Sequence, residues 1–581
     1  MKCGVGAEFP NQIVPSTIAA VRDLSADMNC LIARKQIGVS GDVQRGKYKL
    51  LFNAFTALYP VDFRQVESER PDGLDALIVL DGDQAAGLAA AEDGVPSLVI
   101  MEPTRRGAPT VDRLVRFNSS PQLNPCLRNQ TMIDREDIDF TGLVPEPGDE
   151  ILAYRGEEPA WLVRPKVHSV CQLVAKSPPE LKAHEYLFQY LNGRRFLGLL
   201  PIMNFLGQLT RAQDWAGPPS KACFVFDDPS FYWRSYGFLN FGRLAEHATK
   251  FNYCVSVATI PLDTWWVNRG VASTLRAYSP RLSILIHGNN HTNFEMLTQD
   301  KRVNYREVAA EAMGRMERLV QKHGIPFQKV MEAPYGALGH EMLHPMLAVG
   351  YEAALCTTAL LVLHNPQVDW PATIGMNRSE MLGGGLPVVP RIVMSPDWKN
   401  DVVLAAFLRH PIVVAGHHYD AAHELQILVD LAETINQLES VTWSDMEGIL
   451  HSNYLQKTEG NTLHVKMFSR RVSVPLKPDI RRICVHRPWI QAQQTERLTI
   501  TIDGGLASVY LAEAISESFT IETAVNVEIS SEIDAAKAVP VIESSTAGLW
   551  PIARKIMMET RDRLTPVVPL VNRLRRRPTP L

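Results

Sequence analysis

Acidic and imidazole side chains follow successive apolar runs between residues 221 and 454. Two adjacent carboxylates, Asp227 and Asp228, come directly after the run 224–226, and His287 and His291 follow the run 283–286 with the spacing HxxxH. Later apolar runs are followed by further polar groups, namely Glu332-Ala333-Pro334-Tyr335-Gly336, Ser395-Pro396-Asp397-Trp398 and His417-His418. Ligand sites in parallel α/β folds gather at the carboxyl ends of the strands, so these groups are expected to meet at one edge.

One carboxylate and two imidazoles are the ligand set of a catalytic zinc ion, which keeps one coordination position open for water. Zinc would lower the pKa of water in that position toward ~7, so a neighbouring carboxylate could take up its proton at neutral pH. Adjacent aspartates at a strand end point in different directions. One of Asp227 and Asp228 can therefore bind a divalent metal, most favourably zinc, while the other acts as a base.

The elements that must position these residues alternate between strand and helix. Apolar runs predict strands at 223–226, 254–260, 282–286, 328–331, 353–357, 388–393 and 412–415. Helical periods lie between them, for example at 303–322, where Gly324 ends the pattern. Seven strands alternating with helices indicate a (β/α) barrel or an open doubly wound sheet over residues 221–454.

The first 165 residues predict a separate α/β domain with a parallel sheet, of the Rossmann or flavodoxin type. Apolar runs at 76–80 and 96–100 flank an alanine-rich helical stretch, which is the rhythm of a βαβ unit. Asp81 and Asp83 follow the first run, but the region has no glycine-rich phosphate loop, so an ordinary turn is favoured over a cofactor site. Residues 166–220 are expected to form a helical connector.

After residue 455 the hydrophobic period changes to two. Alternating runs at 463–467, 471–474, 498–502 and 525–529 predict a small antiparallel β domain, similar to a β-sandwich, over residues 455–545. The tail, residues 546–581, has a local charge of +6 with apolar residues nearby. Such a segment could make a peripheral contact with an anionic membrane, although a solvated basic tail is the more common case.

Composition restricts the class of protein. The chain has 581 residues, enough for three or four domains, and its 46% hydrophobic and 21% charged residues are typical of globular proteins. The net charge of −4 argues against a nucleic-acid-coating protein, and no transmembrane run or signal peptide is evident, which favours the cytoplasm. The eight cysteines contain no CxxC pair, so they are expected to be structural thiols in a reducing compartment.

The motifs between residues 221 and 454 resemble those of the polysaccharide deacetylases with a NodB-type domain, carbohydrate esterase family four. In that family a strand ends in Asp-Asp, and His-x-x-x-His, Arg-x-Pro-Tyr, an Asp/Trp motif and Leu-x-His follow. The aspartate pair, the HxxxH pair and Pro334-Tyr335-Gly336 match well, and the last two motifs match loosely. The resemblance implies a distorted (β/α)7 barrel and hydrolysis of a carbon–nitrogen bond in an N-acetylated carbohydrate.

The resemblance also implies roles for the matched residues. Asp227 would be the catalytic base, Asp228, His287 and His291 would bind the metal, and the backbone N–H of Tyr335 would donate to the developing oxyanion. His417 would be the general acid, with His418 as a close alternative. The substrate-binding candidates are Asp397 and Trp398, together with Tyr232 and Trp233, whose aromatic rings could stack on a sugar or simply pack a loop.

One departure from the family pattern bears on activity. Glu332 stands where the family has an arginine, which removes the cation that orients the base, although Arg391 could form the reversed pair with Glu332. The main hypothesis is a metal-dependent hydrolase that removes N-acetyl or other acyl groups from a glycan or glycan precursor of surface-polysaccharide metabolism. The alternative is a catalytically degenerate glycan-binding protein. A glycoside hydrolase is disfavoured, since adjacent aspartates cannot readily place carboxylates ~5–9.5 Å apart across a sugar ring.

Overall fold

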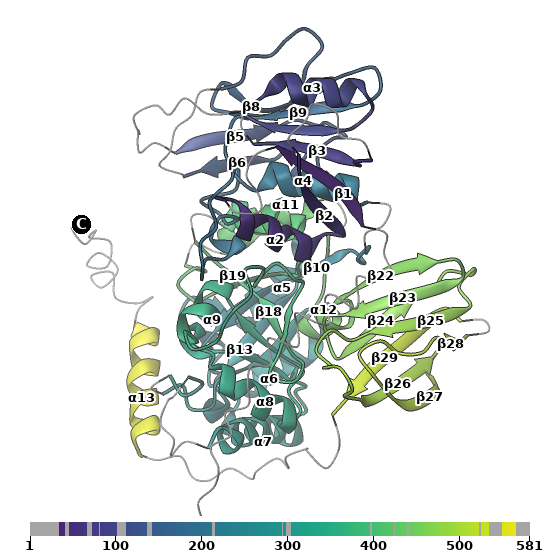
Figure 1. Cartoon of the computed structure of the whole chain (residues 1–581). Helices are drawn as coiled ribbons and strands as arrows, with labels where there is room; N and C mark the ends of the chain where they lie inside the picture. Colours follow the sequence, from purple (N-terminus) through teal and green to yellow (C-terminus); the bar gives the residue numbers. More distant parts are fainter. Residues whose placement is uncertain are drawn as a thin grey trace, which may run out of the picture.

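A computed structural model of the chain describes most of its residues, and Figure 1 shows their arrangement. The described residues are 34–40, 46–66, 73–80, 82–101, 112–135, 142–211, 215–292, 294–297, 304–395, 398–422, 425–438, 441–521, 524–533 and 549–564. An N-terminal sheet domain packs on a central domain, and a β domain follows at the side of the central domain (Figure 1).

The N-terminal domain is a mixed sheet. Its strand order is β2 (Val61–Val66), β1 (Lys35–Ser40), β3 (Ala76–Val79), β4 (Ser97–Ile100), β9 (Val170–Val174), β8 (Glu158–Pro165), β7 (Glu150–Arg155), β5 (Arg113–Phe117) and β6 (Thr131–Asp134). The predicted βαβ unit is β3, α3 (Gln84–Glu92) and β4, with parallel strands. Another helix, α2 (Lys49–Leu58), connects β1 and β2.

Two expectations for this domain are corrected. The sheet is parallel only from β2 to β9, because the pairings of β9 with β8, β8 with β7, β7 with β5 and β5 with β6 are antiparallel. Moreover, β9 lies within the expected helical connector and inserts between β4 and β8, so the sheet extends beyond residue 165. In the connector, α4 (Leu200–Leu209) is an α-helix with its first seven residues buried.

The central domain is built on a second sheet. Its order is β17 (Glu380–Leu382), β18 (Leu386–Pro390), β16 (Ala353–Cys356), β15 (Val330–Glu332), β14 (Leu282–His287), β13 (Val255–Thr259), β10 (Ser220–Asp227), β20 (Ile412–Gly416) and β19 (Ile392–Val393), and β21 (Val441–Trp443) also pairs with β10. All pairings from β18 to β19 are parallel. Every predicted strand is present, but the run at 388–393 is split at Arg391 into β18 and β19.

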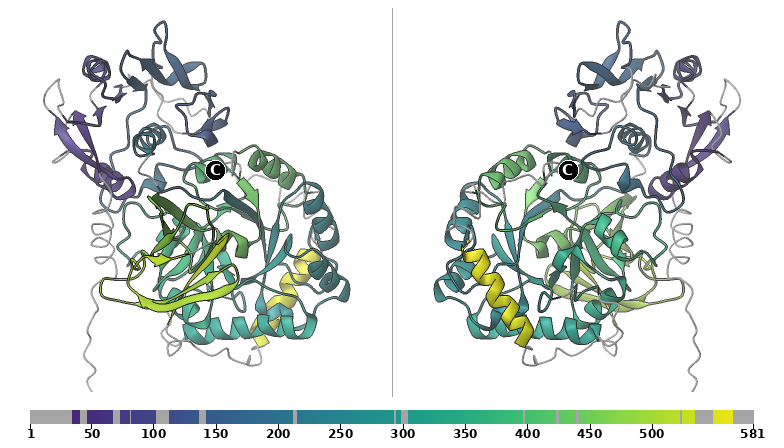
Figure 2. Two further views of the ribbon diagram at one scale, coloured as in Figure 1. Left: turned by 90° about the vertical axis from the view of Figure 1, so that its right-hand side faces the viewer. Right: turned by 90° about the vertical axis from the view of Figure 1, so that its left-hand side faces the viewer.

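The split at Arg391 explains how this sheet curves. β18 and β19 lie at opposite ends of the parallel array, yet a single residue separates them in the chain. The two ends of the array therefore lie side by side, and the sheet curls around its own interior. Figure 2 shows helices around the curled sheet. These are α5 (Phe241–Lys250), α6 (Arg269–Ala277), α7 (Tyr305–His323), α8 (His340–Val349), α9 (Thr358–His364), α10 (Trp398–Phe407) and α11 (Gln426–Asn436).

The interior of the curled sheet is apolar. Alternate residues of a strand share one face, and the inward ones form a buried cluster that includes Val225, Leu285, Val330, Val389 and Val413. Met446, Ile449 and Leu450 of α12 (Met446–His451) belong to the same cluster. Because α12 contacts β10 through Lys221, whose Nζ donates to the Gly448 carbonyl at 2.9 Å, this helix closes the interior at the amino ends of the strands.

The β domain consists of two four-stranded sheets around a core of its own. One has the order β22 (Tyr454–Glu459), β23 (Thr462–Met467), β25 (Arg482–His486) and β28 (Phe519–Thr520), and the other β24 (Arg471–Pro475), β29 (Asn526–Glu532), β26 (Glu496–Ile502) and β27 (Gly505–Ala512). The chain then reaches α13 (Leu549–Leu564), which lies along the central domain (Figure 1, Figure 2). Among the described helices, none combines the length and apolar character needed to cross a membrane.

Candidate active site

Polar residues continue the inward-facing series of the strands at their carboxyl ends. On β10, for example, Asp227 follows the inward residues Cys223 and Val225 at intervals of two. The same spacing applies on the neighbouring strands, and the inward polar residues are Asp227, His287, Glu332, Arg391 and His417. These five side chains thus lie above the apolar interior, at the end opposite α12.

Three side chains form a cluster with the geometry of a metal site. The Oδ1 atom of Asp228 lies 3.3 Å from Nε2 of His287 and 3.2 Å from Nε2 of His291. Tetrahedral ligands at about 2.0–2.2 Å from a zinc ion are about 3.3 Å apart, so these spacings fit one ion. The Nδ1 atom of His287 donates to the Glu332 carbonyl at 2.9 Å, which leaves Nε2 as the ligand atom, as in many metal sites.

The electrostatics of the cluster favour a cation. Burial acts against charge on both Asp228 and His287. Their mutual hydrogen bond and the nearby histidines nevertheless hold the pKa of Asp228 well below its usual range. The Asp228 hydrogen bond and the charge of Asp227 raise the pKa of His287 to about 9 despite its burial. An anionic environment that stabilises an imidazolium proton also stabilises a metal cation in its place.

A second group of residues, not found by the sequence analysis, holds the HxxxH loop. One oxygen of Glu295, Oε1, accepts from the backbone N–H groups of Asn289, Asn290 and His291 at 2.7, 3.0 and 2.7 Å. Burial raises the pKa of Glu295, and these backbone donors oppose that rise. Gly288, with φ of 64°, must be glycine, because a Cβ there would lie 2.5 Å from Glu295 Oε1.

The same loop is also bound to α7. Nη1 of the buried Arg315 donates to the side-chain oxygens of Asn289 and Asn290 at 2.7 and 2.8 Å, and its Nη2 pairs with Glu311 at 2.9 Å. Glu311 in turn accepts from the side-chain amide of Asn289 at 2.8 Å. The helix thereby fixes the loop that carries His291.

The reversed pair expected from the sequence is present. Nη1 of Arg391 contacts Oε1 of Glu332, and it also donates to Oδ2 of Asp227 at 3.0 Å. Burial raises the pKa of Glu332, whose side chain is completely enclosed. The positive charge beside Asp227 therefore comes from Arg391, because residue 332 is a glutamate and cannot supply it. The other oxygen of Asp227, Oδ1, is buried and accepts no hydrogen bond from the described residues.

Replacing Arg391 by methionine is expected to lower the free energy of unfolding by about 3–5 kcal/mol, because Asp227 and Glu332 would remain buried without a cation. Urea unfolding monitored by circular dichroism measures this difference. The double variant Arg391→Met/Glu332→Gln removes one of the two buried carboxylates that have lost their cation. It should recover part of the lost free energy of unfolding. Equal stability of the double and single variants would contradict the pairing.

The remaining catalytic candidates differ in their surroundings. Tyr335 lies in the turn η5 (Pro334–Gly336) with φ of 58°, and its exposed ring is 4.8 Å from that of His291. His417 is exposed, and its charge acts on Asp228. His418 is instead buried against Tyr236 and Tyr419, with ring centroids at 5.3 and 3.8 Å. The inward register and the exposure favour His417 over His418 as the group that faces the site.

Aromatic rings surround Tyr232, whose hydroxyl is 3.5 Å from Asp263, a residue of the cavity that Asp228 and His291 also line. The hydroxyl of Tyr232 accepts from Nε1 of Trp265 at 2.7 Å, and the Trp266 ring is 6.0 Å from that of Tyr232. Trp233, Trp265 and Trp266 are all exposed, and the two latter were not identified from the sequence, which gave no motif for them. Trp398 begins α10 and is nearly buried, so it offers little surface to a sugar. Asp397 lies outside the described residues.

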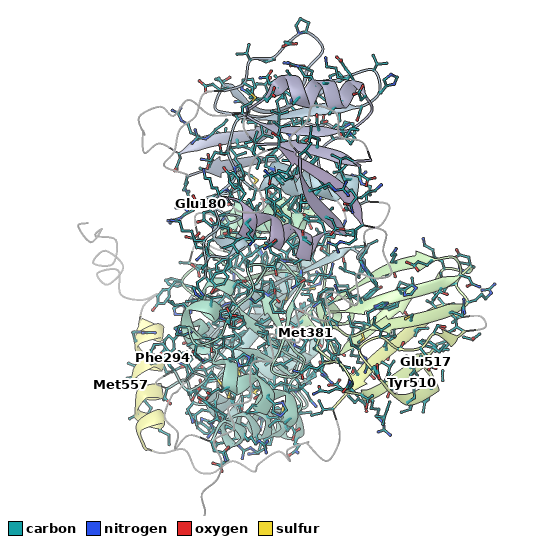
Figure 3. All side chains as sticks on the ribbon, in the orientation of Figure 1. Glu180, Phe294, Met381, Tyr510, Glu517 and Met557 are labelled. Atoms are coloured by element: carbon teal, nitrogen blue, oxygen red, sulfur yellow. The ribbon has the colours of Figure 1, made fainter. Side chains whose placement is uncertain are left out.

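The helix α13 reaches the edge of this site. Met558 lines a narrow cavity together with Asp228 and His291, and the Ser230 hydroxyl donates to Oε2 of Glu559 at 3.0 Å. In Figure 3, Met557 on α13 and Phe294, next to the HxxxH loop, are labelled on the same side of the molecule. Residues 549–564, part of the segment predicted as a basic tail, thus form a helix against the site.

The chain resembles known proteins only at the level of solved structures. No family model matches the sequence, and no curated protein matches it. Solved structures do resemble part of the chain: a T48 deacetylase with substrate has 14% identity and a TM-score of 0.24, over 40% of this chain and 91% of the other. A polysaccharide deacetylase from Mycobacterium smegmatis has 16% identity and a TM-score of 0.28, over 41% of this chain and 91% of the other.

A family 4 carbohydrate esterase from Streptomyces lividans, in complex with acetate, has 11% identity and a TM-score of 0.25, over 39% of this chain and 91% of the other. The similar structures also include a cytoplasmic protein from Salmonella typhimurium with 9% identity and a TM-score of 0.22, over 30% of this chain and 98% of the other. Solved structures similar to about two-fifths of this chain thus include carbohydrate esterase family 4 deacetylases, the family that its motifs resemble.

Proposed function

We propose that the protein is a metal-dependent hydrolase that removes N-acetyl, or other acyl, groups from a glycan or glycan precursor. The observation that carries this proposal is the convergence of Asp228, His287 and His291 within ligand distance of one another, with the carboxylate of Asp227 beside them. A metal at this cluster, most favourably zinc, would polarise the acyl carbonyl and make a water molecule more acidic.

The surrounding residues would transfer protons, bind the oxyanion and hold the sugar. Asp227 would take the proton from the attacking water at its free Oδ1, while Arg391 holds Oδ2 in place. The backbone N–H of Tyr335 would donate to the oxyanion that develops from the carbonyl oxygen. His417 would protonate the leaving amine. The exposed rings of Trp233 and Trp265, near Tyr232, would stack on the sugar.

The alternative, a degenerate glycan-binding protein, rests on Glu332 in the position of the family arginine. Arg391 weakens that argument, because it brings a guanidinium to Asp227 from the junction of β18 and β19. A glycoside hydrolase gains no support, since Asp228 is engaged with His287 and His291 while Asp227 is held by Arg391.

Acetate release tests the proposal directly. The full chain, stripped with a chelator and then reloaded with zinc, should release acetate from N-acetylated oligosaccharides only in the reloaded state. Zinc binding at Asp228 and His291 with no release from any N-acetylated glycan tested would overturn the hydrolase and favour the glycan-binding alternative.

The two adjacent histidines provide a further prediction. His417→Ala should retain the active-site metal and lose most activity, because the leaving amine would lack its proton donor. His418→Ala should keep activity, although truncation of this ring, buried against Tyr236, should lower the free energy of unfolding. Initial rates and thermal unfolding separate the two effects. Loss of activity in the His418 variant alone would reverse the assignment.

A membrane contact is proposed for the C-terminal segment. The described part of α13 presents exposed apolar side chains at Ile552, Ile556 and Met557, and basic residues continue beyond it. Exposed apolar side chains with nearby positive charge favour binding to anionic lipid surfaces. We propose a cytoplasmic enzyme that can associate with the membrane and act on a lipid-linked glycan precursor.

A further inference from the structure

A second cluster of metal-competent side chains lies in the β domain, outside the candidate active site. β23 and β25 are parallel neighbours, and their register places His464 beside Cys484 and Lys466 beside His486. Leu463 and Val465 of β23 point into the domain core, so His464 lies on the opposite face of the sheet. Cys484 and His486 share that face, which brings the three side chains together.

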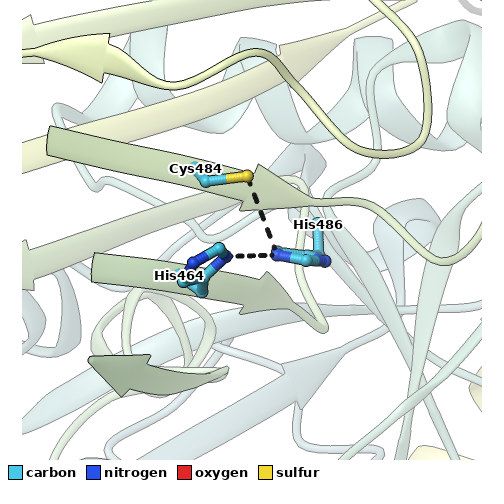
Figure 4. A group of neighbouring side chains, drawn as sticks. All are labelled: His464, Cys484 and His486. Carbon is cyan, nitrogen blue, oxygen red and sulfur yellow. Dashed lines mark hydrogen bonds between the residues drawn. The ribbon is translucent and has the colours of Figure 1, made fainter. Parts of the chain in front are cut away.

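The distances within this cluster suit a tetrahedral ion. Nδ1 of His464 is 3.0 Å from Nε2 of His486, which is also 3.8 Å from Sγ of Cys484 (Figure 4). With Zn–N bonds of about 2.0–2.1 Å and a Zn–S bond of about 2.3 Å, tetrahedral angles place two nitrogens about 3.3 Å apart and nitrogen and sulfur about 3.6 Å apart. These two separations are within a few tenths of an ångström of the tetrahedral values, and all three ligand atoms lie within 4.8 Å of one another.

The surroundings of the cluster resemble those of established metal sites. Cys484 and His486 are only 7% and 4% exposed, and the Trp215 ring meets His486 edge-on at 5.1 Å. The second ring nitrogen of His464, Nε2, faces Oε2 of Glu459 at 3.7 Å. A carboxylate beside the non-ligating nitrogen commonly orients a metal-bound histidine. Three protein ligands leave one position for a water molecule.

We propose that His464, Cys484 and His486 form a second, thiolate-containing metal site that binds zinc. A thiolate with two imidazoles selects a soft or borderline ion such as zinc over magnesium or calcium. Binding forms one Zn–S and two Zn–N bonds and releases the thiol proton of Cys484 to solvent. That proton otherwise faces the Ser516 carbonyl, 3.3 Å from the sulfur. The candidate active-site cluster contains no sulfur ligand, so the two sites differ in chemistry.

The position of this site indicates a structural role. Ala216 and Gln456 exchange two backbone hydrogen bonds of 2.8 and 2.7 Å next to Trp215, so the segment entering β10 is attached to the β domain there. β10 carries Asp227 at its other end. Zinc bound across β23 and β25 would stabilise this junction without contacting the substrate. Bound metal would therefore raise the unfolding temperature of the β domain.

Cobalt substitution of the full chain tests the site, because a cobalt–thiolate bond gives a near-ultraviolet charge-transfer band that histidine and carboxylate ligands do not give. The wild type and His291→Ala should both show this band, while Cys484→Ser should lack it. His464→Ala, a change at a less buried ligand, should weaken zinc binding at this site by more than about 100-fold, since even loss of an orienting partner costs about 10- to 100-fold.

Cys254→Ser is the matched control, because Cys254 is a buried thiol of the central domain and should leave the band unchanged. Zinc content should fall by one equivalent in Cys484→Ser, and retention of the other equivalent shows that this variant is folded. A wild-type chain that binds cobalt without the band, or a band that persists in Cys484→Ser, would overturn the second site. Neither result bears on the hydrolase proposal, which acetate release tests separately.

Discussion

Replacing His291 by alanine is expected to remove one equivalent of bound metal and essentially all hydrolytic activity while the chain remains folded. Only two side chains, Asp228 and His287, would remain to bind the ion. The fold should persist because the backbone N–H of residue 291 would still donate to Glu295, and Arg315 would still hold the preceding asparagines. Elemental analysis after dialysis and acetate release measure the two effects.

His344→Ala is the matched control for this experiment, since His344 is an exposed histidine on α8. It should retain both metal and activity. Full metal occupancy of the active site in His291→Ala, shown in the Cys484→Ser background to exclude the second site, would contradict the ligand assignment.

Replacing Asp227 by asparagine is expected to keep the metal and lower the rate by about 10²–10⁴-fold, the usual contribution of a general base. Asparagine retains the size of the side chain but cannot take up a proton from water. The three ligands stay in place, because Asp227 contacts Arg391, and the ligand carboxylate belongs to Asp228. Loss of the Asp227 charge should weaken metal binding far less than loss of a ligand would. Single-turnover rates and metal content together separate a lost base from a lost ligand.

Asp228→Asn provides the contrast, since it alters the adjacent residue and should weaken metal binding as well as activity. Full activity in Asp227→Asn would show that the base is another residue. A loss of metal in Asp227→Asn equal to that in Asp228→Asn would show instead that both aspartates are ligands.

The strands that carry the site could be predicted because their apolar runs are short and continuous, as burial on both faces requires. The polar residue after each run was therefore visible in the sequence, from Asp227 to His417. The curl of the sheet could not be predicted in the same way. It depends on the run 388–393, which reads as one strand but divides at Arg391 between two pairing partners.

The supporting residues of the site were less accessible to sequence analysis. Glu295 matches no motif, and its role depends on a local fold that turns the backbone N–H groups of the HxxxH loop toward it. Arg315 lies on the predicted helix, but its role appears only when α7 packs beside that loop. Similarly, His464 and Cys484 are 20 residues apart, and only the parallel register of β23 and β25 makes them neighbours. Spacing rules such as CxxC describe ligands on one turn, so they miss ligands that a strand pairing assembles.

Under the proposed function, the docked helix α13 would compete with the glycan substrate for the rim of the site. Met558 and Glu559 reach the rim of the metal cluster from the same molecule, so their local concentration there does not fall on dilution. A glycan that needs this rim must displace the helix, and its apparent affinity is reduced by the fraction of molecules in which the rim is open. Dissociation constants measured with and without residues 546–581 would therefore differ by the free energy of this internal contact.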